Sequence, residues 1–262
     1  MNKLETLITV LKDMKSALLA YSGGVDSTFL LKAMQLSQIQ ALAVTAFSEI
    51  TPHTDFVVAM QTVEEFGIDH MVIKTDELSN EEFVRNSPDR CFVCKDKRFK
   101  NLTDIALSKG YTFVIDGSNV DDTTDFRPGS KAAEKHNVRS PLIEAGFTKQ
   151  DIRESSKHLG LSTWNKPASP CLATRFPYGQ RITKDILKRV EQAEDFLKSL
   201  GFNTIRVRDH GGVARIEVAV DKIELLIVPQ TRDTISEYLK KLGYTFISLD
   251  LDGYGVRSQY LK

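Results

Sequence analysis

The chain has 262 residues, of which 41% are hydrophobic and 27% charged, and its 35 acidic residues balance its 35 basic ones. This size and composition suit a globular protein with one α/β domain and a smaller second domain. The neutral charge gives no overall field that would attract nucleic acid, and no apolar run approaches the roughly 20 residues that a membrane span needs. We therefore expect a cytoplasmic protein that keeps its three cysteines reduced.

The first half of the chain alternates short apolar segments with amphipathic ones, a pattern that predicts a parallel sheet covered by helices. The second apolar segment shows no polar alternation, as expected for a strand that is buried on both faces. The pairing of Thr148 with Asp151 resembles a capping box and predicts the start of another helix. The predicted strands cover residues 17–21, 41–47, 70–73 and 112–116, and the predicted helices between them cover residues 55–66 and 99–109.

The later part of the chain is predicted to form a small α+β unit. Residues 165–179 contain three prolines, which block regular structure, so this segment is predicted to be a loop. Thr183 then caps an amphipathic helix that ends before Gly201. Two strands, a helix and a third strand are predicted beyond it, at residues 204–207, 214–220, 231–242 and 245–249. We place the domain boundary in the loop, with a first domain of residues 1–170 and a second of residues 171–262.

The most distinctive segment is the loop Ser-Gly-Gly-Val-Asp-Ser at residues 22–27, between the first predicted strand and an apolar helix. Its glycines let the backbone turn tightly and bring amide N–H groups against a ligand, and the helix N-terminus adds partial positive charge. A glycine pair alone is more often a plain turn, but this position, with Asp26 and Ser27 beside it, favours pyrophosphate binding. The lysine of a Walker loop is absent from this segment, so transfer of a γ-phosphate is not the expected chemistry.

This loop resembles the PP-loop of the ATP pyrophosphatases, which cleave ATP to AMP and pyrophosphate and activate an oxygen atom as an adenylate. The resemblance implies a Rossmann-like first domain of the adenine nucleotide alpha hydrolase kind, with Mg²⁺ near the phosphates. It also implies that adenine is recognised at the ends of the first two strands, around Ala20 and Thr45. Gly117 follows a further strand end, where doubly wound sheets open their ligand crevice. The residues expected to hold pyrophosphate are Ser22, Gly23, Gly24, Asp26 and Ser27.

Further motifs extend across nearly the whole chain: Phe-Ser-Glu at residues 47–49, Asp-Gly at 116–117, Asp-Phe-Arg-Pro-Gly at 125–129, Trp-Asn-Lys-Pro-Ala-Ser at 164–169, Arg-Phe-Pro-Tyr-Gly at 175–179 and Arg-Val-Arg at 206–208. With the loop, they resemble the LarE family, which adenylates the carboxylates of pyridinium-3,5-biscarboxylic acid mononucleotide and replaces an oxygen of each with sulfur. That reaction makes the organic part of the nickel-pincer cofactor of lactate racemase. The resemblance implies an ATP-dependent sulfur transferase that assembles as a homo-hexamer.

The LarE resemblance also implies a substrate site in the second half of the chain. Arg206 and Arg208 match a pair of arginines that bind the phosphate of the mononucleotide, and the alternation of a strand places both on one face. Thr174 and Arg175 match a hydroxyl and an arginine beside the substrate, and Glu194 matches a glutamate on the following helix. Without the resemblance, the two strand arginines would be interpreted as a solvated face and Glu194 as a surface residue.

The chain has three cysteines, Cys91, Cys94 and Cys171, and we expect all three in loops beside the active site. Three thiolates without a fourth suit a [4Fe–4S] cluster with one open iron that can hold a sulfide. Zinc would need a fourth ligand, and no histidine lies at ligand spacing from these cysteines. Lys95 follows the first pair, where its charge would offset that of the adenylate or the cluster.

Other uses of the cysteines and other acceptors stay open. In the best-known form of the LarE family a single cysteine gives up its own sulfur, and that position falls here on Pro170, one residue before Cys171. Sacrificial or persulfide chemistry at Cys171 is therefore the alternative to a cluster, beside a disulfide between Cys91 and Cys94 or three unrelated buried thiols. A tRNA-thiolating or amidating ATP pyrophosphatase and a non-catalytic nucleotide-binding module are the competing functions.

Overall fold

The computed structural model describes residues 2–123 and 128–255, so residues 125–127 of one sequence motif lie outside the described part. No helix in these two ranges is both long enough and apolar enough to cross a membrane. The chain divides into two compact units, which are described separately. The first unit comprises residues 1–76 and 89–169, and the second comprises residues 77–88 and 170–262.

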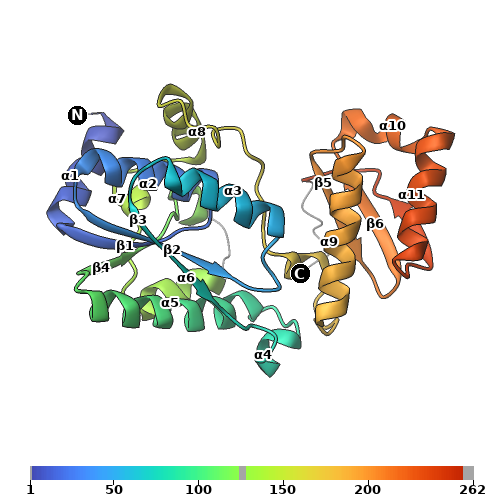
Figure 1. Cartoon of the computed structure of the whole chain (residues 1–262), viewed down its shortest axis with the longest axis horizontal. Helices are drawn as coiled ribbons and strands as arrows, with labels where there is room; N and C mark the ends of the chain where they lie inside the picture. Colours follow the sequence, from blue (N-terminus) through green and yellow to red (C-terminus); the bar gives the residue numbers. More distant parts are fainter. Residues whose placement is uncertain (1, 124–127, 256–262) are drawn as a thin grey trace. The chain divides into compact units, whose positions relative to one another are not determined.

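The first unit contains four parallel strands, β1 (Ser16–Ala20), β2 (Gln40–Phe47), β3 (Asp69–Lys74) and β4 (Phe113–Ile115). They form one sheet in the order β3-β2-β1-β4 (Figure 1), which confirms the predicted Rossmann-like α/β class. The chain moves outward from β1 to β2 and β3 and then returns to the other side of β1. The topological switch point therefore lies between the carboxyl ends of β1 and β4, where open α/β sheets bind their ligands.

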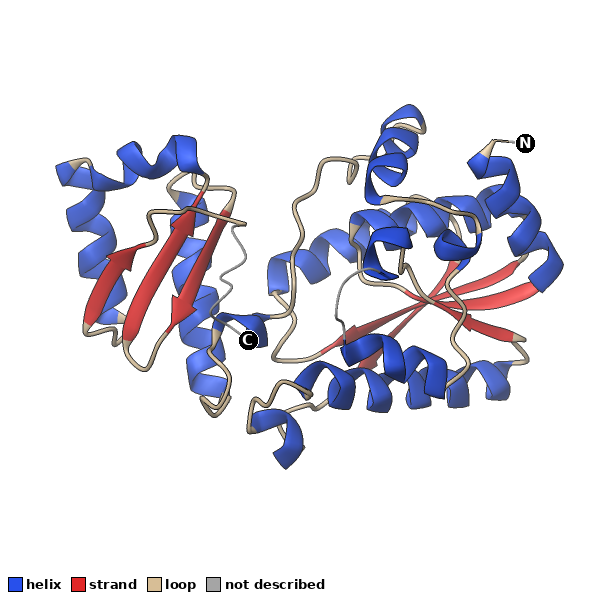
Figure 2. Cartoon of the chain, turned by 180° about the vertical axis from the view of Figure 1, so that it is seen from behind, coloured by secondary structure: helices blue, strands red, loops and turns tan. Residues whose placement is uncertain are grey.

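Helices cover both faces of this sheet (Figure 2). Alternation along β1 separates two cores: Leu19 packs in the core with α1, α2, α3, α7 and α8, whereas Leu18 packs with α5 and α6. The sheet is thus buried on both faces, as the apolar strands predicted. The helices of this unit, with one 3₁₀ turn, are α1 (Lys3–Met14), α2 (Val25–Ser37), α3 (His53–Glu64), α5 (Arg90–Lys109), η1 (Val120–Thr123), α6 (Pro128–Lys135), α7 (Pro141–Glu144) and α8 (Lys149–His158).

Helix α5 begins at Arg90, well before the predicted start at residue 99. Cys91 and Cys94 therefore lie in the first turns of a helix, and the prediction that places them in a loop is wrong. Phe92 packs against the same core as Phe99, but the four charged residues 95–98 lie between them, so the sequence does not show a continuous apolar stripe there. The capping box at Thr148, by contrast, is present and begins α8 as predicted.

The second unit is built on strands β5 (Ile205–Asp209), β6 (Val213–Val218) and β7 (Phe246–Leu249). They form a sheet in the order β5-β6-β7, with β5 antiparallel and β7 parallel to β6. Leu197, Val207 and Ile216 are buried in its core, and Thr183 caps the long helix α9 as predicted. The helical segments of this part are η2 (Leu172–Arg175), α9 (Lys184–Ser199), η3 (Val220–Lys222), α10 (Ile223–Ile227) and α11 (Pro229–Lys241).

Residues 77–88 group with the second unit, although they precede the loop in which the domain boundary is predicted. This segment contains the short helix α4 (Glu81–Val84). Both terminal nitrogens of Arg181 donate to the carboxylate of Glu81, at 2.7 and 2.8 Å. Because the two partners are 100 residues apart in the sequence, no local pattern predicts this association.

Candidate active site

The loop after β1 makes a tight turn at the N-terminus of α2. Gly23 has a φ of +68°, and a Cβ atom there would lie 2.4 Å from the Cβ atom of Ala59 on α3, so only glycine fits. Gly24 is the N-cap of α2, and Thr28 N donates to its carbonyl oxygen at 2.9 Å. The N–H groups between Gly24 and Thr28 have no acceptor within the helix, so they are available to an anion.

The hydroxyl groups of Ser22 and Ser27 and a second glycine, Gly117, also lie at this loop. The Oγ atoms of Ser22 and Ser27 lie 3.0 Å apart, and Ser27 Oγ donates to the Gly24 carbonyl at 3.2 Å. A Cβ atom at Gly117, just after β4, would lie 3.0 Å from the backbone nitrogen of Ser27. The segments after β1 and β4 therefore touch at the switch point of the sheet, where the crevice for a ligand is expected.

Asp26 is the acidic residue of the loop, and two donors orient its carboxylate. Nζ of Lys149, the first residue of α8, lies 2.5 Å from one oxygen, and Nδ2 of Asn119 lies 3.4 Å from the other. Asn119 is buried and accepts a hydrogen bond from the backbone nitrogen of Asp121 at 3.0 Å. A single lysine thus balances this carboxylate, which is the kind of hard oxygen ligand that Mg²⁺ takes beside phosphates.

Ala20 and Thr45 lie at the carboxyl ends of neighbouring strands, near the same edge of the sheet. Ala20 of β1 pairs with Val44 of β2, so Thr45 is one residue further along the adjacent strand. Thr45 is buried, and its hydroxyl lies 3.0 Å from Nε2 of His70 on β3. Burial lowers the pKa of His70, so its imidazole is neutral at pH 7 and shares a hydrogen bond with the Thr45 hydroxyl.

Cys91 and Cys94 lie one turn apart at the start of α5, a spacing that puts both thiols on one side of the helix. Both are partly exposed and neither is in a disulfide, and Nη2 of Arg98 lies 3.6 Å from Sγ of Cys94. Cys171, which is partly exposed and not in a disulfide, belongs to the second unit. Over the described ranges, no three His, Cys, Asp or Glu side chains are gathered into a group that could hold a metal ion.

Lys95 packs between α5 and the start of α6. Its Nζ lies 5.9 Å from the ring centre of Phe99, within the range of a cation–π interaction. A Cβ atom at Gly129 would lie 2.6 Å from Cδ of Lys95, so the glycine of the Asp-Phe-Arg-Pro-Gly motif makes room for the lysine stem. The structure thus relates two features of the sequence, a motif and a candidate catalytic lysine, that lie far apart along the chain.

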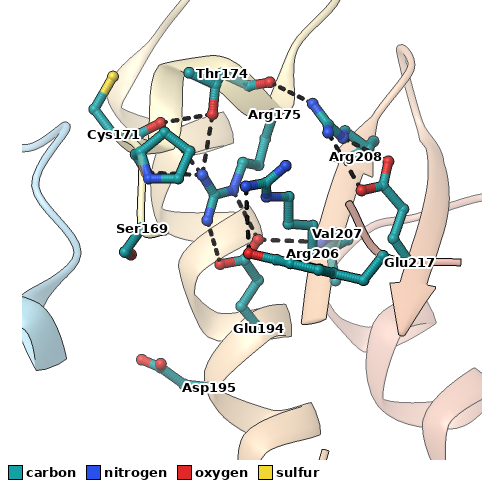
Figure 3. Close-up of polar contacts among 12 residues, drawn as sticks. Ser169, Cys171, Thr174, Arg175, Glu194, Asp195, Arg206, Val207, Arg208 and Glu217 are labelled. Atoms are coloured by element: carbon teal, nitrogen blue, oxygen red, sulfur yellow. Dashed lines mark hydrogen bonds and ion pairs between the residues drawn. The ribbon is translucent and has the colours of Figure 1, made fainter. Parts of the chain in front are cut away.

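In the second unit, Arg175 and Glu194 form a buried ion pair (Figure 3). Nε and Nη2 of Arg175 lie 2.8 and 3.0 Å from the two carboxylate oxygens of Glu194 on α9, and both residues are only 3% exposed. Glu194 also accepts a hydrogen bond from the backbone nitrogen of Val207 on β5, at 3.0 Å. Glu194 is therefore a core residue rather than the surface residue that its charge suggested.

The same guanidinium fixes the turn that carries Cys171. Nη1 of Arg175 donates to the carbonyl oxygens of Pro170 and Cys171, at 2.8 and 3.4 Å. The backbone nitrogen and the hydroxyl of Thr174 also donate to the Cys171 carbonyl, at 3.0 and 2.9 Å. Hydrogen bonds to backbone atoms thus hold the turn, and its partly exposed thiol is carried on a fixed main chain.

Arg206 and Arg208 share one face of β5, as predicted from strand alternation. Arg208 pairs with Glu217 of β6 at 2.7 and 3.2 Å and donates to the Thr174 carbonyl at 2.8 Å (Figure 3). Arg206 lies over the ring of Tyr254, 4.6 Å from its centre, and donates to its hydroxyl at 3.3 Å. Hydrogen bonds within the protein therefore occupy more of the donor groups of Arg208 than of Arg206.

Arg206 keeps hydrogen-bonding capacity for an anion. Its Nε is buried, and no acceptor for it is found among the described residues. Burial is the main cause that lowers the pKa of this guanidinium, with the neighbouring charges of Arg175 and Arg208 adding to the effect. A phosphate group bound here would give the buried Nε an acceptor oxygen. Its negative charge would also stabilise the charged form of the guanidinium.

Replacing Arg175 with methionine is expected to lower the free energy of unfolding by about 3–5 kcal/mol, because Glu194 is left as an uncompensated buried charge. Urea denaturation followed by circular dichroism measures this loss. The double variant Arg175→Met/Glu194→Gln should recover most of it, since the amide is neutral and still accepts from the Val207 nitrogen. A single variant as stable as the unmodified protein would show that the pair does not hold the turn.

The first unit defines the class of protein: a Rossmann-like α/β fold with a glycine loop and free helix N–H groups at its switch point. No family model matches the chain. The pyridinium-3,5-bisthiocarboxylic acid mononucleotide synthase of Lactiplantibacillus plantarum, however, is 39% identical over 254 residues, which are 96% of this chain and 91% of that protein. The chain therefore belongs to the family of this synthase, the LarE family.

Two uncharacterised proteins are also similar to this chain along most of their length. One, from Synechocystis sp., is 39% identical over 254 residues, covering 97% of this chain and 95% of the relative. The other, from Methanocaldococcus jannaschii, is 32% identical over 241 residues, covering 92% and 91%. Similarity along both units, rather than at the loop alone, supports the family assignment.

The structure adds residues to the candidate site that sequence reasoning missed. Lys149 contacts Asp26, and Lys166 contacts the carbonyl of Gly23. Lys149 follows the capping residue of a helix and carries no further sequence signal. Lys166 lies in the Trp-Asn-Lys-Pro-Ala-Ser motif, and that motif was the signal that could have found it.

Proposed function

We propose that the protein is an ATP-dependent sulfur insertase in nickel-pincer cofactor biosynthesis. It adenylates the carboxylates of pyridinium-3,5-biscarboxylic acid mononucleotide and replaces an oxygen of each with sulfur, which gives pyridinium-3,5-bisthiocarboxylic acid mononucleotide. The observation that carries the proposal is the 39% identity to the Lactiplantibacillus plantarum synthase over 96% of this chain.

The first unit supplies the groups for adenylation. A carboxylate oxygen of the substrate attacks the α-phosphorus of ATP, an oxygen–phosphorus bond forms, and the bond to pyrophosphate breaks. The N–H groups at the start of α2, with the hydroxyls of Ser22 and Ser27, bind the pyrophosphate, and Asp26 takes the Mg²⁺ ion. Adenine lies toward Ala20 and Thr45, at the ends of β1 and β2.

The second unit supplies the groups that hold the mononucleotide. Arg206, whose Nε has no acceptor among the described residues, and Arg208 bind the phosphate of the substrate. Arg175 and Glu194 are positioning residues, because they fix the turn that carries Thr174 and Cys171. In the second step a sulfur nucleophile attacks the activated carbonyl carbon, a carbon–sulfur bond forms, and AMP leaves with the oxygen.

For the sulfur source, we propose a [4Fe–4S] cluster held by Cys91, Cys94 and Cys171. The donor chemistry fits, because none of the three cysteines is in a disulfide and two of them lie one turn apart on α5. When bound, such a cluster would supply sulfide from an iron that no cysteine ligates. Sacrificial or persulfide chemistry at Cys171 is the alternative source. A homo-hexamer in the cytoplasm completes the proposal on the basis of the LarE resemblance.

The proposal is tested by incubating anaerobically purified protein with ATP, Mg²⁺, the biscarboxylic acid mononucleotide and sulfide. We expect AMP and pyrophosphate in equal amounts, and a mononucleotide whose mass increases by the difference between sulfur and oxygen, once or twice. Mass spectrometry and a pyrophosphate assay measure these products, and reactions without ATP are the control. Pyrophosphate release that depends on tRNA instead of the mononucleotide would point to the thiolating alternative and contradict the proposal.

A further inference from the structure

Lys166 belongs to the Trp-Asn-Lys-Pro-Ala-Ser motif at residues 164–169, which has no role in the function proposed above. Its Nζ lies 3.2 Å from the carbonyl oxygen of Gly23, in the loop after β1. The same nitrogen lies 3.1 Å from a carboxylate oxygen of Asp55, on the first turn of α3. The two charged side chains are 19% and 22% exposed, so the ion pair is partly exposed at the edge of the loop.

The backbone around Lys166 is fixed, so its side chain is aimed at the loop. Arg153 on α8 donates Nη1 to the carbonyl of Trp164 and Nη2 to the carbonyl of Lys166, both at 2.9 Å. The backbone nitrogen of Lys166 donates to the Thr163 carbonyl at 3.0 Å, and Lys157 lies over the ring of Trp164 at 4.9 Å. A helix of the first unit therefore holds the segment from which Lys166 reaches out.

We propose that Lys166 binds the pyrophosphate part of ATP in this loop. The inference rests on the proposed function and deepens it by adding a cation to the nucleotide site. The loop has no lysine of its own, its charged side chain is that of Asp26, and the helix N-terminus offers only partial positive charge. Gly23 directly precedes Gly24, the N-cap of α2, and consecutive Cα atoms are about 3.8 Å apart. An ammonium group on the Gly23 carbonyl is therefore within reach of an anion held by the N–H groups that begin α2.

A change of partner by Lys166 is physically favourable when nucleotide binds. Its present partners are a neutral carbonyl and a single carboxylate, and a partly exposed pair of this kind is weak. Pyrophosphate carries several negative charges, so it competes well with Asp55 for the ammonium group. The flexible stem of a lysine lets the charge follow the anion while the anchored backbone stays in place.

Calorimetric titration of the full chain tests this assignment, with Mg²⁺–pyrophosphate, α,β-methylene-ATP and AMP as probes. Lys166→Met and Lys166→Gln should each weaken binding of pyrophosphate and of the ATP analogue by about tenfold or more. The glutamine keeps a donor for the Gly23 carbonyl but has no charge. Binding of AMP, which lacks the β- and γ-phosphates, should change by less than about twofold. Lys100→Met removes an exposed lysine of the same unit, paired with Asp104 on α5, and should bind all three probes like the unmodified protein.

The possible outcomes separate this inference from the proposed function. Unchanged affinity of Lys166→Met and Lys166→Gln for pyrophosphate would overturn the role of Lys166 and leave the sulfur insertase proposal standing. An equal loss of AMP binding would also overturn it, because Lys166 would then only hold the segment in place. Failure of the unmodified protein to bind either phosphate probe would overturn the ATP-dependent function together with this inference. Lys166→Arg, which keeps the charge, should restore most of the affinity if the assignment is right.

Discussion

Replacing Asp26 with asparagine is expected to abolish the release of AMP and pyrophosphate while leaving the fold intact. The amide keeps the shape of the carboxylate, and its oxygen still accepts a hydrogen bond from Lys149 or Asn119, but it brings no charge to Mg²⁺. Removal of one such electrostatic group typically costs about 10²- to 10³-fold in rate. The lost ion pair has side chains that are 35% and 23% exposed, so the stability cost should be about 1 kcal/mol or less.

A pyrophosphate release assay and urea denaturation measure the two effects of Asp26→Asn separately. Asp104→Asn is the matched control, because it also removes a carboxylate from an ion pair with a lysine, 3.1 Å away on the exposed side of α5. The control should lose neither activity nor appreciable stability. An Asp26→Asn protein that releases pyrophosphate at the unmodified rate would remove the loop from the mechanism. An unfolded variant would mean instead that the carboxylate is needed for structure.

The strands of the first unit could be predicted from the sequence, because short apolar runs of neighbouring residues mark them. The apolar run predicted at residues 41–47 became β2, Gln40–Phe47, since a strand buried on both faces must be apolar throughout. Helix α1 was missed, although Asn2 and Glu5 form a capping box at its start and Leu7 and Leu11 are buried one turn apart. Its mixed charges concealed an apolar stripe that periodicity could have revealed.

The candidate site was predictable where its residues are neighbours in the sequence, and not where folding brings them together. The loop at residues 22–27 could be recognised because its glycines, serines and aspartate are contiguous. The two lysines that contact the loop were not recognised, because Lys149 and Lys166 lie 123 and 143 residues from their partners in it, and only Lys166 belongs to a sequence motif. Glu194 looked like a surface residue because it is charged, although it shares a face of α9 with the buried Val190 and Leu197. Its burial depends on an ion pair with an arginine 19 residues earlier, and helical periodicity does not predict that pairing.

Replacing Cys171 with alanine is expected to abolish sulfur transfer while AMP and pyrophosphate are still formed. The turn should survive, because Arg175 and Thr174 hold it through the carbonyl oxygens of Pro170 and Cys171 rather than through the thiol. Adenylation needs groups of the first unit, which the substitution does not touch. The thiocarboxylated product is measured by mass spectrometry and the pyrophosphate by a coupled assay. Sulfur transfer that persists in the variant would exclude Cys171 from the chemistry.

A Cys91→Ala variant distinguishes between two sulfur sources that both require Cys171, a [4Fe–4S] cluster and the sulfur of Cys171 itself. If the three cysteines hold a [4Fe–4S] cluster, Cys91→Ala should also lose sulfur transfer, and anaerobically purified protein should carry about four irons per chain. If Cys171 gives up its own sulfur, Cys91→Ala should keep one turnover, and the intact chain should lose the mass of one H₂S. Ser108→Ala, near the other end of the same helix, is the control for changes in α5. An iron-free protein that turns over repeatedly without loss of mass would contradict both sources. It would leave a persulfide on Cys171, loaded by an external donor of sulfane sulfur, whose acyl disulfide product is cleaved by an external thiol reductant.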